Sequence, residues 1–155
     1  MTQLHYRNPA KAYLQRYRAA RTRQQSLLRA VADLRESLTG TTQALRPDPV
    51  TGSGPTDRMA AVVAEIADME AAMADALAEV NQALRDTLAA IDAVPDETQR
   101  AVLTLRYVEG LDWLTIAERI YLSEARAYVI HGRALVAVNE WMKKREETIV
   151  DPVLQ

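Results

Sequence analysis

The apolar positions between residues 113 and 135 follow a helical spacing that breaks once, near the middle of the segment. A single amphipathic helix would carry one continuous stripe, so this pattern predicts two short helices joined by a tight turn. That arrangement is typical of a helix-turn-helix, a module that binds DNA. The inner residues of the two predicted helices and their turn are Ile116, Ala117, Ile120, Leu122, Ala127, Ile130, Ala134 and Leu135.

Polar residues at the helix starts support this interpretation. Asp112 precedes the first short helix, predicted over about 113–120, and Ser123 precedes the second, predicted over 124 to about 142. Both side chains can accept hydrogen bonds from the free N–H groups at a helix start, and Glu124 favours the positive end of the helix dipole. Tyr121 stands where many such turns have Gly or Asn, so we expect an uncommon φ angle there.

Two long helices are predicted ahead of this segment. The first, about 9–39, has apolar residues at spacings of three and four, is interrupted by Gln24 and is expected to end at Gly40. The second, about 57–93, has three interleaved apolar series with an eleven-residue period, which favours a different supercoil and packing over only part of the length. Segment 40–56 is rich in Pro, Gly, Thr and Ser, which predicts a loop. The series are Tyr17, Ala20, Leu27, Val31, Leu34 and Leu38 in the first helix, and Val62, Met73, Leu84, then Ile66, Leu77, Leu88, then Met69, Val80, Ile91 in the second.

A further helix is expected between the long pair and the two short helices. Pro95 is placed at its first position with Asp96 and Glu97 in its first turn, and Tyr107 ends it. The composition as a whole, with no Phe and five Gly, favours an all-α chain. We therefore expect a long, coiled-coil-like helical hairpin over 1–93, a three-helix domain with the helix-turn-helix over 94–142, and a frayed tail over 143–155.

Charge is segregated along the chain. Residues 1–46 carry nine Lys or Arg against two acids, residues 47–97 carry two against eleven, and residues 98–155 carry eight of each. The net charge of −2 therefore says nothing about binding of nucleic acid. The arginines of the first helix allow two hypotheses, a second phosphate-contacting face or pairing with the acidic second helix. We favour the pairing.

Several classes of function have no support in the sequence. The chain has no Cys, which removes disulfides and thiolate metal sites. No His, Asp and Glu cluster has metal-ligand spacing, and GSG at 52–54 lacks the Lys-Ser/Thr of a phosphate-binding loop. We expect no enzyme activity, no metal and no cofactor. Apolar runs fall short of the roughly 20 residues of a membrane span, and the N-terminus lacks a signal-like apolar core, so we expect a cytoplasmic protein.

The segment QRAVLTLRYVEGLDWLTIAERIYLSEARAYVIHGRAL, residues 99–135, resembles region 4 of bacterial sigma factors. Together with YLQRYR at 13–18, DPVTGSGPTDRMAAVVAEIADME at 48–70 and HGRAL at 131–135, the arrangement resembles the phage transcriptional activators of the RinA and ArpU type over about 9–142. The resemblance implies a DNA-binding regulator of phage late, packaging or integration genes. It would act in the cytoplasm of a bacterial host by binding double-stranded promoter DNA and meeting the host RNA polymerase.

Candidate DNA contacts follow if the second short helix enters the major groove. Arg126 is the main candidate, because a guanidinium can bond a guanine in bidentate fashion. Tyr128 has the alternative of packing on Trp113 or Tyr121, the dipole alone can explain Glu124, and we expect Trp113 in the core. The base-contact candidates are Glu124, Ala125, Arg126, Tyr128 and Val129; the phosphate-contact candidates are Thr115, Arg119, His131 and Arg133.

The sequence also raises hypotheses about assembly and two rival functions. We expect a homo-oligomer, with a dimer favoured, because the stripes of 9–93 are longer than one partner of different supercoil preference should satisfy. One rival is a small terminase subunit for DNA packaging, although such proteins usually begin with the helix-turn-helix. The other is an adaptor that binds protein through a degenerate helix-turn-helix and its acidic helix, which Ala127 and Val129 favour.

Overall fold

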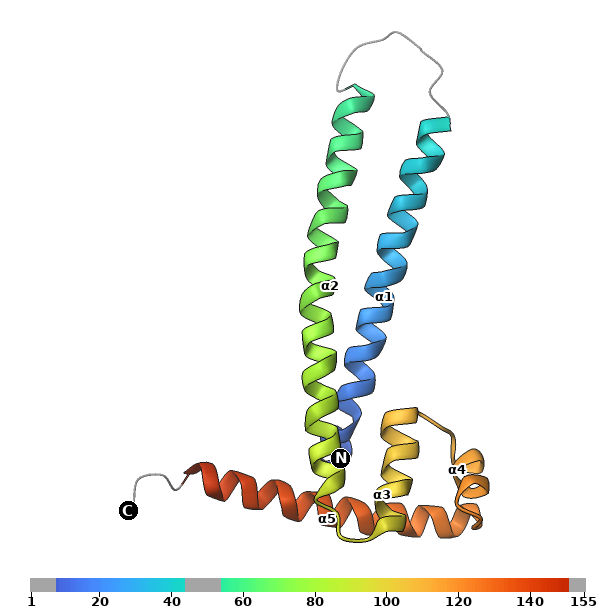
Figure 1. Cartoon of the computed structure of the whole chain (residues 1–155), viewed down its shortest axis with the longest axis vertical. Helices are drawn as coiled ribbons and strands as arrows, with labels where there is room; N and C mark the ends of the chain where they lie inside the picture. Colours follow the sequence, from blue (N-terminus) through green and yellow to red (C-terminus); the bar gives the residue numbers. More distant parts are fainter. Residues whose placement is uncertain (1–7, 44–53, 151–155) are drawn as a thin grey trace, which may run out of the picture. The chain divides into compact units, whose positions relative to one another are not determined.

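The computed structural model describes residues 8–43 and 54–150, and these residues form helices joined by short turns (Figure 1). The all-α class predicted from the sequence is confirmed, since no strand occurs within the described ranges. Two compact units are present, one formed by 20–80 and the other by 81–150 with the first part of α1. The elements are α1 (Pro9–Gln43), α2 (Pro55–Asp92), α3 (Glu97–Leu103), the π-helical segment η1 (Thr104–Glu109), α4 (Trp113–Arg119) and α5 (Glu124–Val150).

In the 20–80 unit, α1 and α2 run antiparallel and are joined by two ion pairs. Arg23 pairs with Glu79 and Arg35 pairs with Glu70. All four side chains are largely exposed, so each pair contributes only about 0–1 kcal/mol. Burial of apolar side chains therefore dominates the stability of this unit. The predicted α1 stripe is confirmed, since its members are buried or half-buried, and Gln24, which interrupts it, is half-buried as well. The members are Tyr17, Ala20, Leu27, Val31, Leu34 and Leu38.

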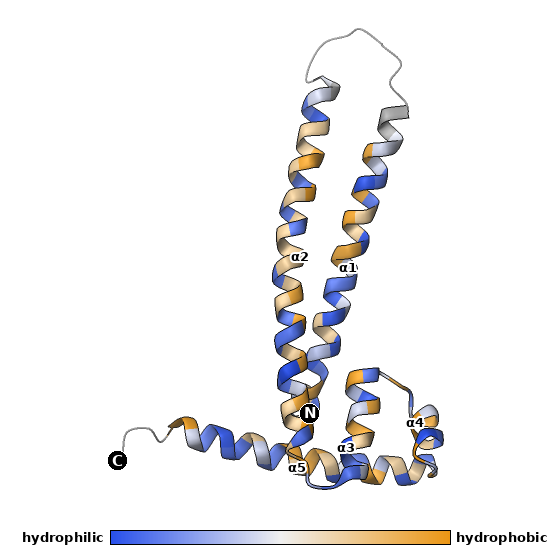
Figure 2. Cartoon of the chain, viewed as in Figure 1, coloured by the Kyte–Doolittle hydropathy of each residue, from blue (hydrophilic) through white to orange (hydrophobic). Residues whose placement is uncertain are grey.

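Two of the three eleven-residue series predicted for α2 are buried or half-buried throughout, namely Val62, Met73, Leu84 and Met69, Val80, Ile91, and the third is half-buried only at Ile66. The inner positions of α2 in this unit follow alternating spacings of four and three, which is a heptad, because α2 must keep facing the heptad stripe of α1. Leu77 and Leu88, two members of the eleven-residue series, are exposed. Figure 2 shows apolar residues recurring along the whole of α2. The inner residues are Val62, Ile66, Met69, Met73, Ala76 and Val80.

Several predicted boundaries differ from the structure. The helix expected to end at Tyr107 is α3 up to Leu103 and continues as η1 to Glu109. Helix α1 continues through Gly40 to Gln43, so Gly40 does not end it, and segment 44–53 of the predicted loop lies outside the described residues. Pro95 precedes α3, and Asp96 is its N-cap, with a carboxylate that accepts a 2.8 Å hydrogen bond from the Gln99 N–H. An aspartate at the N-cap accepts a hydrogen bond from a free N–H group at the helix start. The proline side chain has no acceptor for this role.

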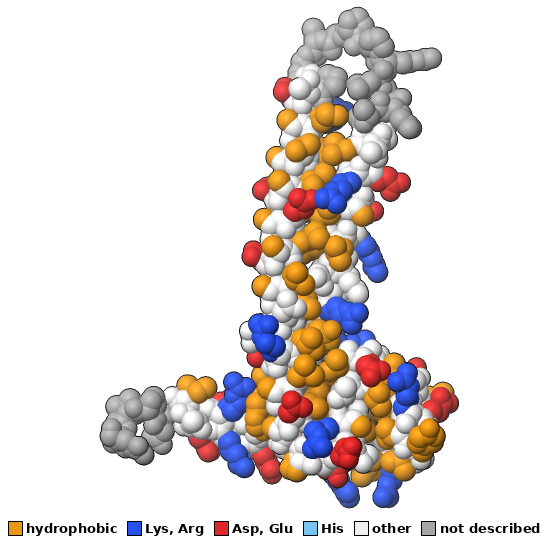
Figure 3. All heavy atoms as spheres, viewed as in Figure 1, with side chains coloured by type: hydrophobic (Ala, Val, Ile, Leu, Met, Phe, Trp, Pro, Cys, Tyr) orange, Lys and Arg blue, Asp and Glu red, His pale blue; other side chains and the backbone are white. Residues whose placement is uncertain are grey.

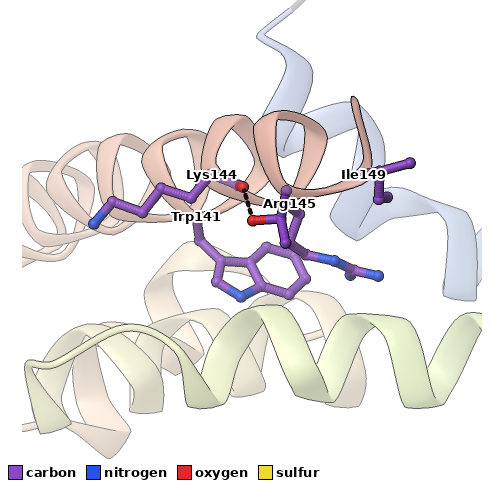
Figure 4. Close-up of a pocket in the computed structure, with 5 residues that line it drawn as sticks. Trp141, Lys144, Arg145 and Ile149 are labelled. Atoms are coloured by element: carbon purple, nitrogen blue, oxygen red, sulfur yellow. Dashed lines mark hydrogen bonds between the residues drawn. The ribbon is translucent and has the colours of Figure 1, made fainter. Parts of the chain in front are cut away.

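Helix α5 extends to Val150, eight residues beyond its predicted end at 142, so the start of the predicted tail is helical. Contacts one turn apart support this extension. The Arg145 guanidinium lies 4.7 Å from the centre of the Trp141 ring, and the Thr148 hydroxyl donates to the Lys144 carbonyl. These residues and Ile149 line a cavity of about 300 Å³ beside the helix (Figure 4). The Tyr13 ring meets Trp141 edge-on at 6.0 Å, which connects α5 to α1.

The larger core of the 81–150 unit combines residues of α1, α2, α3, η1 and α5. An asparagine pair closes it at one end, since Asn139 accepts from the Ala10 N–H at 2.9 Å and donates to Asn8 at 3.2 Å. Asn8 in turn accepts from the Ala10 N–H at the start of α1. The buried members of this core are Ala10, Leu14, Ala90, Ile91, Val94, Leu103, Tyr107, Ala134, Leu135 and Val138.

Gly110 ends the π-helical segment with a φ of +78°. Its N–H donates to the Leu105 carbonyl, and a Cβ atom at this position would lie 2.8 Å from Cζ of Arg18. Only glycine fits here without strain in the backbone and displacement of the arginine.

We expect Gly110→Ala to lower the free energy of unfolding by about 1–2 kcal/mol, because alanine is strained at this positive φ, whereas the guanidinium at the end of the flexible Arg18 side chain can move aside. Urea unfolding of the full chain measures this change. Gly132→Ala is the matched control, since its Cβ would meet no described atom within 4 Å and the helix gains about 0.5–1 kcal/mol. Equal destabilisation by the two substitutions would contradict the prediction.

Candidate nucleic-acid interface

Helices α3, α4 and α5 enclose a second, smaller apolar core. Its buried members are Val102, Ile116, Ala117 and Ala127. Ala117 and Ala127 are small, so α4 and α5 can approach closely at this point. The half-buried residues packed around it are Leu105, Leu111, Trp113, Ile120 and Ile130. This packing fixes which side of α5 faces outward.

The connection between α4 and α5 is a tight turn over residues 120–123. Tyr121 has a φ of +56°, as its position in the sequence predicts, and its side chain is exposed. The Leu122 N–H donates to the Ala117 carbonyl at 3.0 Å, and the Ser123 hydroxyl accepts from the Arg126 N–H at 3.2 Å. The predicted cap at Ser123 is therefore confirmed.

Asp112 caps the start of α4, also as predicted. Its carboxylate accepts a 2.8 Å hydrogen bond from the Thr115 N–H, and this bond holds the pKa of the Asp112 carboxyl below its ordinary value. Each of the two short connections before α4 and α5 therefore ends in a side-chain cap supplied by the residue just before the helix.

The structure places all five base-contact candidates on the exposed side of the first turns of α5. Ala125 and Val129 lie nearly opposite the buried Ala127 and Ala134, with Arg126 beside them. Tyr128 is half exposed because one side of its ring packs on Trp113, with ring centres 4.4 Å apart. The exposed candidates are Glu124, Ala125, Arg126, Tyr128 and Val129.

Trp113 is half-buried and packed against the small core, which agrees with the expected core role. Its ring lies 5.0 Å from the Arg106 guanidinium and 4.8 Å from the His131 ring. Of the two roles that the sequence allows for Tyr128, packing on Trp113 is present in the structure, and part of the Tyr128 ring stays exposed.

His131 differs from the phosphate contact expected from the sequence. Its side chain is only 9% exposed, and Nε2 lies 2.8 Å from the Tyr107 hydroxyl. Burial, with smaller effects from Lys11 and Arg106, lowers the pKa of His131 to about 4, and burial raises the pKa of Tyr107 to about 12. The sequence held the signal, because His131 is four residues from both Ala127 and Leu135 and so shares their inner face.

The other phosphate candidates lie nearer the surface. Arg133 is exposed on α5, seven residues after Arg126 and so on the same side of the helix. Arg119 is exposed on α4 with its guanidinium 3.6 Å from the Glu109 carboxylate, and Thr115 is half-buried at the start of α4. The candidate arginines are thus Arg126 and Arg133 on α5 and Arg119 on α4.

Other kinds of site find no support in this part of the chain. Over residues 8–43 and 54–150, no three His, Asp or Glu side chains are grouped to hold a metal ion. No helix in these ranges has the length and apolar character needed to cross a membrane. Comparison of the chain with family models, curated proteins and solved structures finds no match.

The burial of His131 makes stability depend on pH. The folded pKa of about 4 lies below the unfolded value of about 6.5, so the unfolded chain binds more protons between these values. The stabilisation is complete above pH 6.5 and is lost as the pH falls towards 4. Urea unfolding at steps from pH 7 to 4.5 should show this loss, and His131→Gln should flatten it. Equal slopes in both proteins would contradict the assignment.

Proposed function

We propose that α4 and α5 form a helix-turn-helix and that the first turns of α5 enter the major groove of double-stranded DNA. The observation that carries this proposal is the sharp turn at Tyr121 and Ser123. This turn leads directly into α5, whose packing buries Ala127 and His131 while Ala125, Arg126 and Val129 face outward. A helix held by its inner face, with its N-terminal residues exposed, has the geometry of a recognition helix.

The exposed residues divide by the contacts that their chemistry allows. Arg126 can bond the O6 and N7 atoms of a guanine, and such a pair discriminates by about 1–3 kcal/mol. Ala125 and Val129 suit apolar contact with thymine methyl groups, which gives Val129 a reading role despite its lack of a polar group. Glu124 can accept from a cytosine amine, and the exposed part of Tyr128 lies beside it.

Phosphate contacts position such a helix on the duplex. Arg133 lies two turns beyond Arg126 on α5, and Arg119 and Thr115 lie on α4, the helix that crosses the backbone in this class of module. His131 is left out of the proposed interface because it is buried and its low pKa keeps it neutral.

The biological role that we propose is that of a phage transcriptional activator of the RinA and ArpU type. The sequence resemblance to sigma-factor region 4 supports it, together with the exposed outer face of α5. Such a regulator binds a promoter and meets the RNA polymerase of its bacterial host. The acidic surface of α2, with residues such as Glu65, Asp68 and Asp75, is available for a protein contact.

A second candidate function rests on a specific feature of the outer face of α5. Ala125, Val129, Gly132 and Val136 are all exposed and follow spacings of four, three and four. This narrow, apolar, small-residue stripe would also fit a helix of a protein partner. The adaptor hypothesis is therefore the alternative outcome of the DNA test.

Selection from a random duplex library with the full-length protein tests DNA reading. We expect an enriched motif. Arg126→Ala should relax specificity at one base pair, with a loss of about 1–3 kcal/mol for the preferred site. Arg133→Ala should weaken binding to all sequences and reduce the slope of log K against log salt by about 0.9.

Arg145→Ala is the matched control, since it removes the same charge from the same helix nineteen residues beyond Arg126, roughly 28 Å along the axis. It should leave both the motif and the specificity unchanged. Absence of any enriched motif would overturn direct DNA reading. Loss of partner binding in a Val129→Lys variant would then support the adaptor.

A further inference from the structure

Three of the four exposed large apolar residues among the described residues of the 20–80 unit lie on one edge of the helix pair. They are Leu28, Val63 and Leu77, which are 46%, 53% and 47% exposed; the fourth, Met59, continues the inner series near the start of α2. Leu28, Val63 and Leu77 each follow an inner position by one residue. Since one residue turns a helix by 100°, these three rotate to the same side, and in antiparallel helices this side is the same edge.

The ion pairs identify the two edges independently. Arg35 and Glu70 also follow inner positions by one residue, and their pairing shows that these positions of the two helices meet. Arg23 and Glu79 precede inner positions by one residue, and they pair on the opposite edge. We call these the Leu77 edge and the Arg23 edge.

The two edges differ in chemistry. On α2, the Arg23 edge carries four acids, Glu65, Asp68, Asp75 and Glu79, separated by alanines. The Leu77 edge of α2 repeats the heptad one residue later with only one acid; its residues are Val63, Ala67, Glu70, Ala74 and Leu77. Figure 3 shows hydrophobic side chains gathered in a line along the two helices of this unit. Two adjacent heptad stripes on one helix are the pattern of a helix that packs against two neighbours.

We propose that the Leu77 edge binds the same edge of a second copy of this chain, which gives an antiparallel four-helix bundle. Charge at this edge selects the arrangement. On the Leu77 edge, α1 carries Arg21 and Arg35, each one residue after an inner position, and α2 carries Glu70. Pairing α1 of one copy with α2 of the other places Glu70 opposite these arginines, whereas pairing α1 with α1 places arginines together.

This arrangement has a two-fold axis parallel to the helices, so each residue keeps its height along the bundle. The pairs Arg23–Glu79 and Arg35–Glu70 place Leu28 level with the turn between Ala74 and Leu77. Leu28 of one copy therefore meets Leu77 of the other, and the small side chains of Ala32, Ala67 and Ala74 allow the helices to approach closely. Both chains enter and leave the bundle at the same end, at residues 20 and 80.

The common end at which both chains enter and leave the bundle matters for DNA binding, and this consequence rests on the proposed function. Both α4–α5 pairs are tethered to the same end of the bundle, as a dimer that reads two half-sites requires. Assembly itself is measured without DNA, so failure of the dimer and failure of DNA reading are distinguishable.

Sedimentation equilibrium of the full-length protein tests the proposal. We expect a mass of twice 17.3 kDa for the unmodified chain and a monomer for the Val63→Glu/Leu77→Glu double variant. Ala61→Glu/Ala72→Glu adds the same two charges to exposed positions of α2 on the Arg23 edge, and this control should remain a dimer. Unchanged helical circular dichroism shows that each variant is folded. A monomeric unmodified chain, or a dimer that survives the Leu77-edge variant, would overturn the proposal.

Single-cysteine variants test the arrangement, because the chain has no native Cys. Leu28→Cys mixed with Leu77→Cys should form a disulfide between copies on mild oxidation, whereas each variant alone should not. A strong cross-link of Leu28→Cys to itself would show α1 against α1 and would overturn the proposed arrangement.

Discussion

The 81–150 unit depends on burial of one continuous face of α5. Ala127 packs in the small core with α3 and α4, and Ala134, Leu135 and Val138 pack in the larger core with α1 and α2. His131 lies between these groups and satisfies its ring nitrogen on the Tyr107 hydroxyl, so the polar group between the two cores is paired. Because both cores hold the same helix face, α5 cannot rotate about its axis without breaking both. The outward direction of Arg126 and Arg133 follows from this constraint.

The turn before α5 carries a cost that the cores offset. A φ of +56° at Tyr121 costs roughly 1–2 kcal/mol for a residue with a Cβ. Each fully buried apolar side chain, such as Ile116 or Val102, stabilises by about 1.5–3 kcal/mol, so burial outweighs the strain. The Tyr121 ring is exposed, so its own packing does not offset the cost of the positive φ. The positive φ at Tyr121 instead occurs in the turn that brings Ala127 into the same small core as Ala117.

Caps and turns, which neighbouring atoms determine, could be predicted from the sequence. Features that depend on contacts beyond the immediate neighbours could not. Asp112, Ser123 and Tyr121 were predicted correctly because a cap or a turn is decided by neighbouring atoms. Gly40 was expected to end α1 and does not, because a glycine weakens a helix interior by only about 1 kcal/mol. The sequence predicts an end of α5 at 142, whereas the helix continues to Val150 with the contact between Trp141 and Arg145 along it. His131 was assigned by residue type, whereas its spacing from Ala127 indicated the inner face. The proposed base and phosphate contacts stay predictions.

One of the three eleven-residue series of α2 leaves the face that packs on α1. An eleven-residue step turns an α-helix by about 20° beyond three full turns. The series Ile66, Leu77, Leu88 therefore begins at a half-buried inner position and drifts to exposed ones. A helix with one neighbour needs apolar residues on one stripe, and polar residues can occupy the next. In α2 the second stripe also holds Val63 and Leu77, so apolar residues occupy two adjacent faces of the helix, of which α1 covers one. The other is the face that we assign to the second copy.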